Sequence, residues 1–242
     1  MGRSNVSSGG FVIFGPPHLP GHYVRTIVFV DGYNLYYGLL RKSKFKWLDL
    51  VTLFSDHVLD INSQLIEVRY YSAPLLGRLC DDADSPQRQR IYWQALRKHC
   101  GGRLKIIEGN FARTTPFLRL AAPIADLPTH TPVQVFALAE KKSDVNLAVD
   151  MMDAACNQHA EQIVLCSNDS DFAPALSLIR MRYPGLKIGL VAPIASEDRR
   201  HLANDLKAHC DWYKPLSRAH LEKSLMPLRI PSSALNCPEV WR

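Results

Sequence analysis

The sequence predicts an α/β protein with a central, mainly parallel sheet joined by crossover helices. Short β-branched runs alternate with segments of helical period along most of the chain, which is typical of such sheets. The first run, Thr26–Val30, is apolar without alternation, as expected for a strand buried on both faces. With 242 residues, of which 47% are hydrophobic, the chain can form one large domain, which we expect over residues 24–215.

The first half of this domain is expected to supply three strands and the helices that join them. Pro86 stands at a favoured first-turn position of its helix, and Gly101–Gly102 follows the end of that helix. In chain order we predict strand Thr26–Val30, helices Gly32–Arg41 and Leu50–Leu59, strand Leu65–Tyr71, helix Pro86–His99 and strand Leu104–Glu108.

An inserted hairpin or loop breaks the alternation at Phe111–Pro132. The segment is rich in Pro and Thr and is long for a connection. Because the chain returns from it just before Asp144, we expect it to line the substrate path or to form a homodimer contact.

The second half is expected to complete the sheet. In chain order we predict helix Ser143–Asn157, strand Gln162–Ser167, a helix near Phe172–Arg182, strand Leu186–Val191, helix Arg199–Lys207 and edge strand Trp212–Lys214. Residues 1–23 are rich in Gly, Ser and Pro and are expected to form a flexible arm. Residues 216–242 are expected to form a C-terminal helix, over Leu216–Leu225, and an irregular tail.

Composition narrows the function classes. The net charge of +6 suits a polyanionic partner, although many basic proteins bind nothing acidic. Neither a membrane-spanning apolar run nor a secretion signal is evident, so we expect no membrane contact. The six cysteines include no C-x-x-C pair, which disfavours zinc and favours reduced thiols in a cytoplasmic protein.

The first candidate functional motif is Asp31-Gly32-Tyr33-Asn34, directly after the first buried strand. Ligands of open α/β sheets bind outside the carboxyl ends of the strands. Asn34 lies in the next turn and is close enough to share such a site. Taken alone, Asp31 also suits a simple helix cap.

The second motif is Ser167-Asn168-Asp169-Ser170-Asp171-Phe172, which again follows a buried strand. One aspartate would explain a helix cap, but a second is not required for it. Like charges raise each other's pKa unless a cation compensates them. A divalent metal is the economical explanation, and a solvated polar turn is the alternative.

The third motif is Lys141-Lys142-Ser143-Asp144. We predict Ser143 as the N-cap, which puts Asp144 in the first turn, at the top of the apolar stripe of its helix. A carboxylate on that face must be compensated or functional. Asp150 and Asp153 lie off the stripe and are expected to be solvated. The three motifs thus bring together four aspartates whose oxygens suit Mg²⁺ or Mn²⁺: Asp31, Asp144, Asp169 and Asp171.

In this order the motifs resemble those of the NYN domain family, in the PIN-like nuclease superfamily. The likeness covers roughly residues 25–215, and Tyr70–Pro74, Gln89–Leu96 and Gly109–Phe111 are similar to segments of its LabA-like bacterial branch. The resemblance implies a PIN-like three-layer α/β/α fold with a central mainly parallel sheet, an acidic metal site and ribonuclease activity.

The resemblance also implies roles for residues. Asp31, Asp144, Asp169 and Asp171 match the acidic metal-site positions, and Asn34 and Ser167 match polar positions beside them. Metal held by these carboxylates would polarise an RNA phosphate and lower the pKa of an attacking water. Ser143 and Asn168 stand where glycine is common, which puts the loop geometry in question.

Substrate contacts are sought among basic and aromatic residues. Lys141 or Lys142 would neutralise phosphate charge, unless they are simple surface lysines. Arg113 and Arg119 lie in the insertion beside phenylalanines. Such residues can bind a single strand of RNA through phosphate contacts and base stacking. Tyr33 suits base stacking or a core position.

Other classes fit less well. A haloacid-dehalogenase-type phosphatase needs a second aspartate where this chain has Tyr33, and no G-x-G-x-x-G follows the first strand. A non-catalytic RNA-binding or scaffold module that retains the fold stays open as an alternative.

Overall fold

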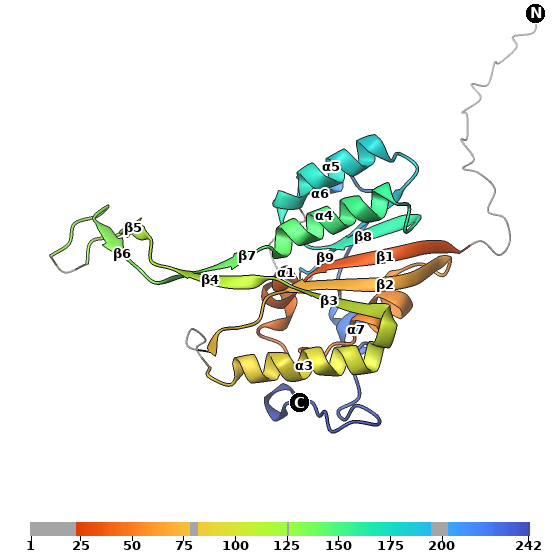
Figure 1. The fold of residues 1–242 in the computed structure, drawn as a ribbon, viewed down its shortest axis with the longest axis horizontal. Coiled ribbons are helices and arrows are strands. Elements are labelled where there is room, and N and C mark those ends of the chain that lie inside the picture. Colours follow the sequence, from red (N-terminus) through yellow and green to blue (C-terminus); the bar gives the residue numbers. More distant parts are fainter. Residues whose placement is uncertain (1–22, 78–81, 125, 195–202) are drawn as a thin grey trace, which may run out of the picture.

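A computed structural model describes residues 23–77, 82–124, 126–194 and 203–242 of the chain. The predicted arm therefore lies, apart from Tyr23, outside the described residues. The core of the molecule is a six-stranded sheet in the order β10-β9-β8-β1-β2-β3 (Figure 1). All of its strand pairs are parallel. The strands are β1 (Val24–Asp31), β2 (Ser63–Ser72), β3 (Leu104–Glu108), β8 (Gln162–Cys166), β9 (Lys187–Ala192) and β10 (Trp212–Pro215).

The order of the strands reverses between β1 and β8. From β1 the chain first builds outward to β2 and β3, and later returns to the other side of β1 to build β8, β9 and β10. In an open α/β sheet this reversal leaves a crevice at the carboxyl ends of the two strands. The fold is α/β and its central sheet is parallel, as predicted.

Helices cover both faces of the sheet and give it three layers. The long helices are α3 (Ser85–Cys100), α4 (Ser143–Cys156) and α5 (Ala173–Arg182). Shorter helical segments are α1 (Gly32–Leu35) with its π-helical continuation η1 (Tyr36–Leu40), α2 (Leu50–Thr52) with its π-helical continuation η2 (Leu53–Val58), η4 (Gly101–Arg103), η5 (Ser170–Phe172), α6 (Asn204–Lys207), α7 (Arg218–Glu222) and η6 (Glu239–Trp241).

Strand β1 shows why its sequence lacks alternation. Val28 and Val30 enter the hydrophobic core that α3 and the C-terminal region cover, whereas Ile27 and Phe29 enter the core beneath α4 and α5. Successive side chains of a strand point to opposite faces, and here both faces are buried. The prediction for Thr26–Val30 is confirmed.

Most predicted elements match within a few residues, with exceptions near the C-terminus. The helix expected over Arg199–Lys207 is described only at Asn204–Lys207, and residues 199–202 lie outside the described residues. The tail helix is confined to Arg218–Glu222. The tail packs on the domain, because Leu221 and Met226 are buried in the α3-side core.

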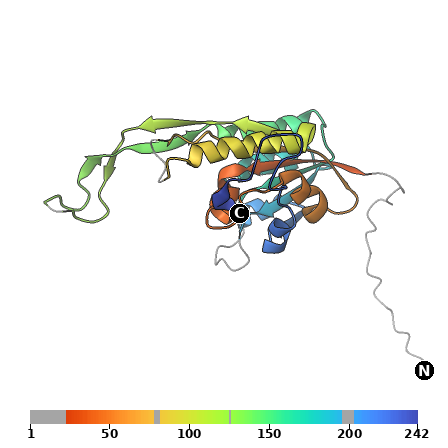
Figure 2. The same ribbon diagram turned by 90° about the horizontal axis from the view of Figure 1, so that it is seen from below.

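The insertion is a long antiparallel hairpin that projects from the body (Figures 1 and 2). Its base is the pair β4 (Asn110–Thr114) and β7 (Ala137–Lys141), and its outer part is the pair β5 (Phe117–Arg119) and β6 (Pro132–Gln134). We call residues 110–141 the hairpin arm. The arm is longer than the predicted Phe111–Pro132 because its returning strand runs up to Lys141.

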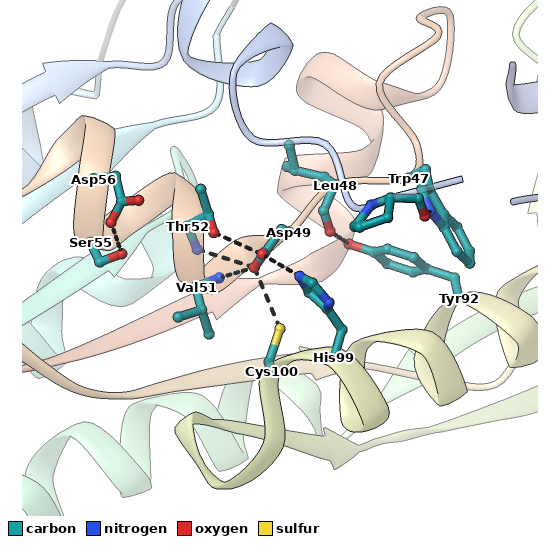
Figure 3. A network of polar contacts seen from close by, with 11 residues as sticks. Trp47, Leu48, Asp49, Val51, Thr52, Ser55, Asp56, Tyr92, His99 and Cys100 are labelled. Atoms are coloured by element: carbon teal, nitrogen blue, oxygen red, sulfur yellow. Dashed lines mark hydrogen bonds and ion pairs between the residues drawn. The ribbon is translucent and has the colours of Figure 1, made fainter. Parts of the chain in front are cut away.

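A buried polar network ties α2 to the end of α3 (Figure 3). Asp49 caps α2, because its Oδ1 accepts hydrogen bonds from the backbone N–H groups of Val51 (2.9 Å) and Thr52 (3.1 Å). Its Oδ2 lies 3.0 Å from Nε2 of His99, and the Cys100 thiol donates to Oδ1 at 3.4 Å. Burial, and then the charge of Asp49, raise the pKa of Cys100 to about 12, which disfavours the thiolate in this network.

No helix of the described residues is both long enough and apolar enough to cross a membrane.

Candidate active site

Two neighbouring strand ends bring the first two motifs together. In the register of β1 and β8, Val30 lies opposite Cys166, so the next residues, Asp31 and Ser167, leave the sheet side by side. The Ser167 hydroxyl donates a hydrogen bond to Oδ2 of Asp31 at 2.9 Å. The backbone N–H of Asp169 in turn donates to Oγ of Ser167 at 3.1 Å.

Glycine at position 32 lets the chain turn sharply after Asp31. A Cβ there would lie 2.5 Å from the carbonyl oxygen of Tyr71 and 2.7 Å from Cζ of Tyr70, closer than side-chain carbons can approach. The close contact between α1 and the end of β2 therefore requires glycine, and it fixes where Asp31 stands.

Asp31 is the most buried of the four aspartates, with 7% of its surface exposed. Its Oδ1 accepts a hydrogen bond from the Asn34 N–H at 2.9 Å, so Asp31 also caps α1. Burial is the main cause that raises the pKa of Asp31 to about 6. The hydrogen bonds from Asn34 and Ser167 act against this rise, and the charges of Asp144 and Asp169 add to it.

Asn34 and Asn168 hold the loop that carries the second motif. The Asn34 Oδ1 accepts a hydrogen bond from the backbone N–H of Asn168 at 3.0 Å. The Asn168 Oδ1 accepts one from the N–H of Ala203 at 2.9 Å. Asp169 caps η5 by accepting from the Asp171 N–H at 3.0 Å. The loop is thus ordered by side-chain amides rather than by a glycine.

Asp144 approaches the cluster from the start of α4. Partial desolvation and then the charges of Asp169 and Asp171 raise its pKa, so the third motif is electrostatically coupled to the second. The expected inward orientation is wrong: Asp144 is exposed, while Leu147 and Met151 of the same helix are fully buried. The buried stripe of α4 runs through Ser143, Leu147 and Met151 at intervals of four residues, so Asp144 lies beside it.

Two further details of α4 differ from the sequence-based interpretation. The N-cap is Lys142, in a left-handed conformation with φ 79°, and Ser143 is the first helical residue. The Ser143 hydroxyl is buried and has no hydrogen-bond partner among the described residues. Asp150 is not simply solvated, since the Tyr71 hydroxyl donates a hydrogen bond to its Oδ2 at 2.6 Å.

The donor chemistry of the cluster fits a hard divalent cation. None of the four aspartates forms an ion pair with a described residue. Burial first, and then the charges of neighbouring carboxylates, raise the pKa values of Asp31 and Asp144. Within the described residues, no three His, Cys, Asp or Glu side chains are arranged closely enough to hold a metal ion. The carboxylates therefore share one edge of the sheet, but in the described conformation three of them do not reach one ion, and side-chain rotation would have to bring them together.

The residues expected to contact substrate are spread over two places. Tyr33 is half-buried beside Asp31, where its ring stacks on Tyr37 at 6.0 Å and meets the edge of Phe111 at 5.7 Å. Lys141 and Lys142 are exposed at the junction of the hairpin arm and α4. Arg113 and Arg119 lie out along the arm, Arg119 in its outer part (Figure 1). The structure does not bring these two arginines to the aspartates.

A cavity beside the cluster was not expected from the sequence. It begins at Gly32 and Tyr33 and extends between η1, the first half of α3 and the C-terminal tail. In the sequence, the cavity is indicated only by three tyrosines on one side of a helical segment, Tyr33, Tyr36 and Tyr37.

A parallel sheet with clustered aspartates at its switch point is the architecture of the PIN-like class. The NYN domain family model matches residues 25–216, and the chain belongs to the NYN domain family. A relative in Pseudomonas putida, 6-hydroxy-3-succinoylpyridine 3-monooxygenase HspA, is 33% identical over 240 residues, which cover 90% of this chain and 75% of the relative.

A solved structure supports the fold alone. A protein of unknown function from Vibrio parahaemolyticus superposes with a TM-score of 0.51 at 16% identity, covering 86% of this chain and 99% of that protein.

Proposed function

We propose that the protein is a ribonuclease that hydrolyses RNA phosphodiester bonds with Mg²⁺ or Mn²⁺ held by Asp31, Asp144, Asp169 and Asp171. The observation that carries this proposal is the state of Asp31. It is a buried carboxylate at the switch point, with a pKa of about 6 and no cationic partner among the described residues. Membership of a PIN-like nuclease family agrees with such a site.

The chain's own residues would share the work as follows. Ser167 and Asn34 orient Asp31 through its two carboxylate oxygens. Asp144 and Asp169 complete an anionic rim around the same space. A bound divalent ion would polarise the phosphate and acidify an attacking water. The exposed Lys141 and Lys142 would attract the RNA backbone next to Asp144.

The test is cleavage of labelled single-stranded RNA, and of DNA of the same sequence, with Mg²⁺ or Mn²⁺ and with a chelator. Asp31→Asn and Asp169→Asn should each abolish cleavage. Asp153→Asn, a change at an exposed position of α4, is the matched control and should cleave normally. Undiminished metal-dependent cleavage by Asp31→Asn would refute the proposal.

The alternative, a non-catalytic RNA-binding or scaffold module, makes a different prediction. Such a module has no need for a metal at the aspartates. A Mn²⁺ titration that shows no difference between the original chain and Asp31→Asn, together with RNA binding without cleavage, would favour this alternative.

The name of the Pseudomonas relative suggests a second candidate, hydroxylation of a small heteroaromatic ring. The observation that favours it is the aromatic-walled cavity beside Asp31. Its test is incubation with 6-hydroxy-3-succinoylpyridine, dioxygen and a two-electron reductant. Mass spectrometry would follow the insertion of one oxygen atom, and the same mixture without reductant is the control.

A further inference from the structure

The cavity beside the aspartates has the size of a small-molecule site. Its volume is about 760 Å³, within the range of roughly 300–1,000 Å³ that ligand pockets occupy. It lies between three segments that are distant in the sequence, namely η1, the first half of α3 and the C-terminal tail.

Aromatic residues form a large share of its lining. Tyr33, Tyr70, Tyr92, Trp93, Phe111 and Trp241 all line it. The ring of Trp241 is held in place by Tyr92, edge to face at 6.3 Å, and by Trp47 at 6.4 Å. Rings that present faces and edges to one space favour a planar aromatic guest, because offset and edge-to-face contacts add to the burial of apolar surface.

Two cations face the same space. The Lys46 ammonium donates a hydrogen bond to the carbonyl of Ser43 at 2.9 Å and forms no ion pair with a described residue. Arg88 is only 15% exposed and pairs with Asp82, which also lines the cavity, and with Asp84; both carboxylates are mostly exposed to solvent. Burial and the charge of Arg88 lower the pKa of Lys46. An anion between the two cations would relieve this repulsion.

A buried hydrogen-bond donor in the wall also lacks an acceptor. Trp93 is 4% exposed, and its indole N–H has no partner among the described residues. Buried polar groups in folded proteins are nearly always paired. A guest with an oxygen or ring-nitrogen acceptor would satisfy this donor.

We propose that the cavity binds a small planar aromatic molecule that carries an anionic group, with its ring among the aromatic walls and its anion at Lys46 and Arg88. The occupant is a free small molecule rather than an RNA strand. The C-terminal tail, through Val240 and Trp241, forms one wall, and Trp241 packs on the buried Trp47, so a strand has no exit on that side. The binding needs neither metal nor cleavage.

The test uses three matched probes and isothermal titration calorimetry on the full chain in chelator-containing buffer. The probes are 2-naphthoate, its uncharged amide, and decahydronaphthalene-2-carboxylate, which keeps the charge without a planar ring. We expect saturable binding of 2-naphthoate and at least about tenfold weaker binding of the other two, which corresponds to the loss of one ordinary contact.

Variants assign the contacts. Lys46→Met should weaken 2-naphthoate about tenfold and leave the amide unchanged, whereas Lys98→Met, an exposed lysine of α3 outside the cavity, should change neither. If Lys46→Met fails to fold, Tyr37→Leu tests the exposed mouth instead and should weaken all ring-bearing probes. Equal binding of acid and amide, an equal loss in Lys98→Met, or displacement of 2-naphthoate by single-stranded RNA would overturn the proposal. RNA cleavage is scored separately, so this proposal and the proposed ribonuclease activity can fail independently.

Discussion

The hydroxyl of Ser167 donates a hydrogen bond to Oδ2 of Asp31 across 2.9 Å and so joins the carboxyl ends of β8 and β1. The other carboxylate oxygen accepts from Asn34 at 2.9 Å. Asp31 is therefore held in a single orientation from two sides. Preorganisation of this kind positions a ligand without further cost in side-chain entropy.

The burial of Asp31 predicts that Asp31→Asn stabilises the metal-free protein at neutral pH. The folded-state pKa of about 6 lies above the ordinary 3.8, so the folded chain binds the proton more tightly than the unfolded chain. The contribution of Asp31 to stability is then highest below pH 4 and is lost as the pH rises through 6. The shift corresponds to roughly 3 kcal/mol at most.

Urea unfolding with chelator checks this prediction. Asp31→Asn should gain up to about 3 kcal/mol at pH 7.5, and the gain should disappear near pH 4. The exposed Asp153→Asn should show no such pH-dependent gain. A difference that is independent of pH would show that the charge of Asp31 is not strained.

Ser167→Ala should change the pKa of Asp31. The Ser167 hydrogen bond lowers this pKa, and its loss should raise the pKa of Asp31 further. Metal binding requires the ionised carboxylate, so the acidic limb of the cleavage profile should move to higher pH, while activity at high pH is largely recovered. Cleavage rates measured between pH 5 and 9 test this. An equal loss at every pH would indicate damage to the loop instead.

The elements of the fold could be predicted because their signals are local. The unbroken apolar run of β1 follows from burial on both of its faces, and Asp31 and Ser167 meet because each directly follows a central strand. Helix α4 starts at Ser143 as predicted, but its N-cap is Lys142, at the base of the hairpin arm, in the left-handed conformation. That turn depends on where the insertion rejoins the domain, which local pattern does not encode.

The cavity could not be predicted for a related reason. Its rings come from α1, β2, α3, β4 and the C-terminal tail, and no spacing in the sequence links them. The tail was predicted as a helix and an irregular segment, and nothing in its sequence indicates that Trp241 packs against Trp47 and Tyr92. Contacts between residues so far apart in the sequence cannot be predicted from local sequence patterns.

Asp49→Ala should destabilise the fold strongly without touching the aspartate cluster. Asp49 is buried and caps α2 while it contacts His99 and Cys100 at the end of α3. Loss of the cap and of the buried network should cost about 2–4 kcal/mol. Asp49→Asn, which can keep part of the cap, should cost less. Thermal unfolding compares the two variants, and a loss below about 0.5 kcal/mol in Asp49→Ala would contradict the structural role.

Acid should reduce the stability that Asp49 provides, whereas it should relieve the destabilisation caused by Asp31. Burial alone would raise the pKa of Asp49, but hydrogen bonds from Thr52 and Cys100 and the charge of His99 bring it below its ordinary value. The stability that Asp49 provides is therefore present above the unfolded pKa, near 4, and is lost as the pH falls through the folded value. The destabilisation by Asp49→Ala should shrink in strongly acidic buffer.

The last prediction concerns the hairpin arm, which we expect to contact RNA or a second copy of the chain. The arm exposes large apolar rings far from the body, with Phe117 69% and Phe136 70% exposed, and the guanidinium of Arg113 lies 4.5 Å from the centre of the Phe136 ring. Exposed rings next to cations are suited to stacking with bases and pairing with phosphates.

The strand register shows where the arm can be shortened. Asn110 to Thr114 pair with Ala137 to Lys141, so replacement of residues 115–136 by a short Gly-Ser turn removes Phe117 and Phe136 and keeps the base of the arm and its junction with α4. In an Asp31→Asn background, which prevents cleavage, RNA affinity should fall about tenfold or the oligomeric state should change. In the chain that keeps Asp31, Mn²⁺ binding should be unaffected by the shortening. Fluorescence anisotropy and light scattering measure these quantities. If both RNA affinity and molecular mass match those of the full-length arm, the arm is a surface elaboration and has no part in binding.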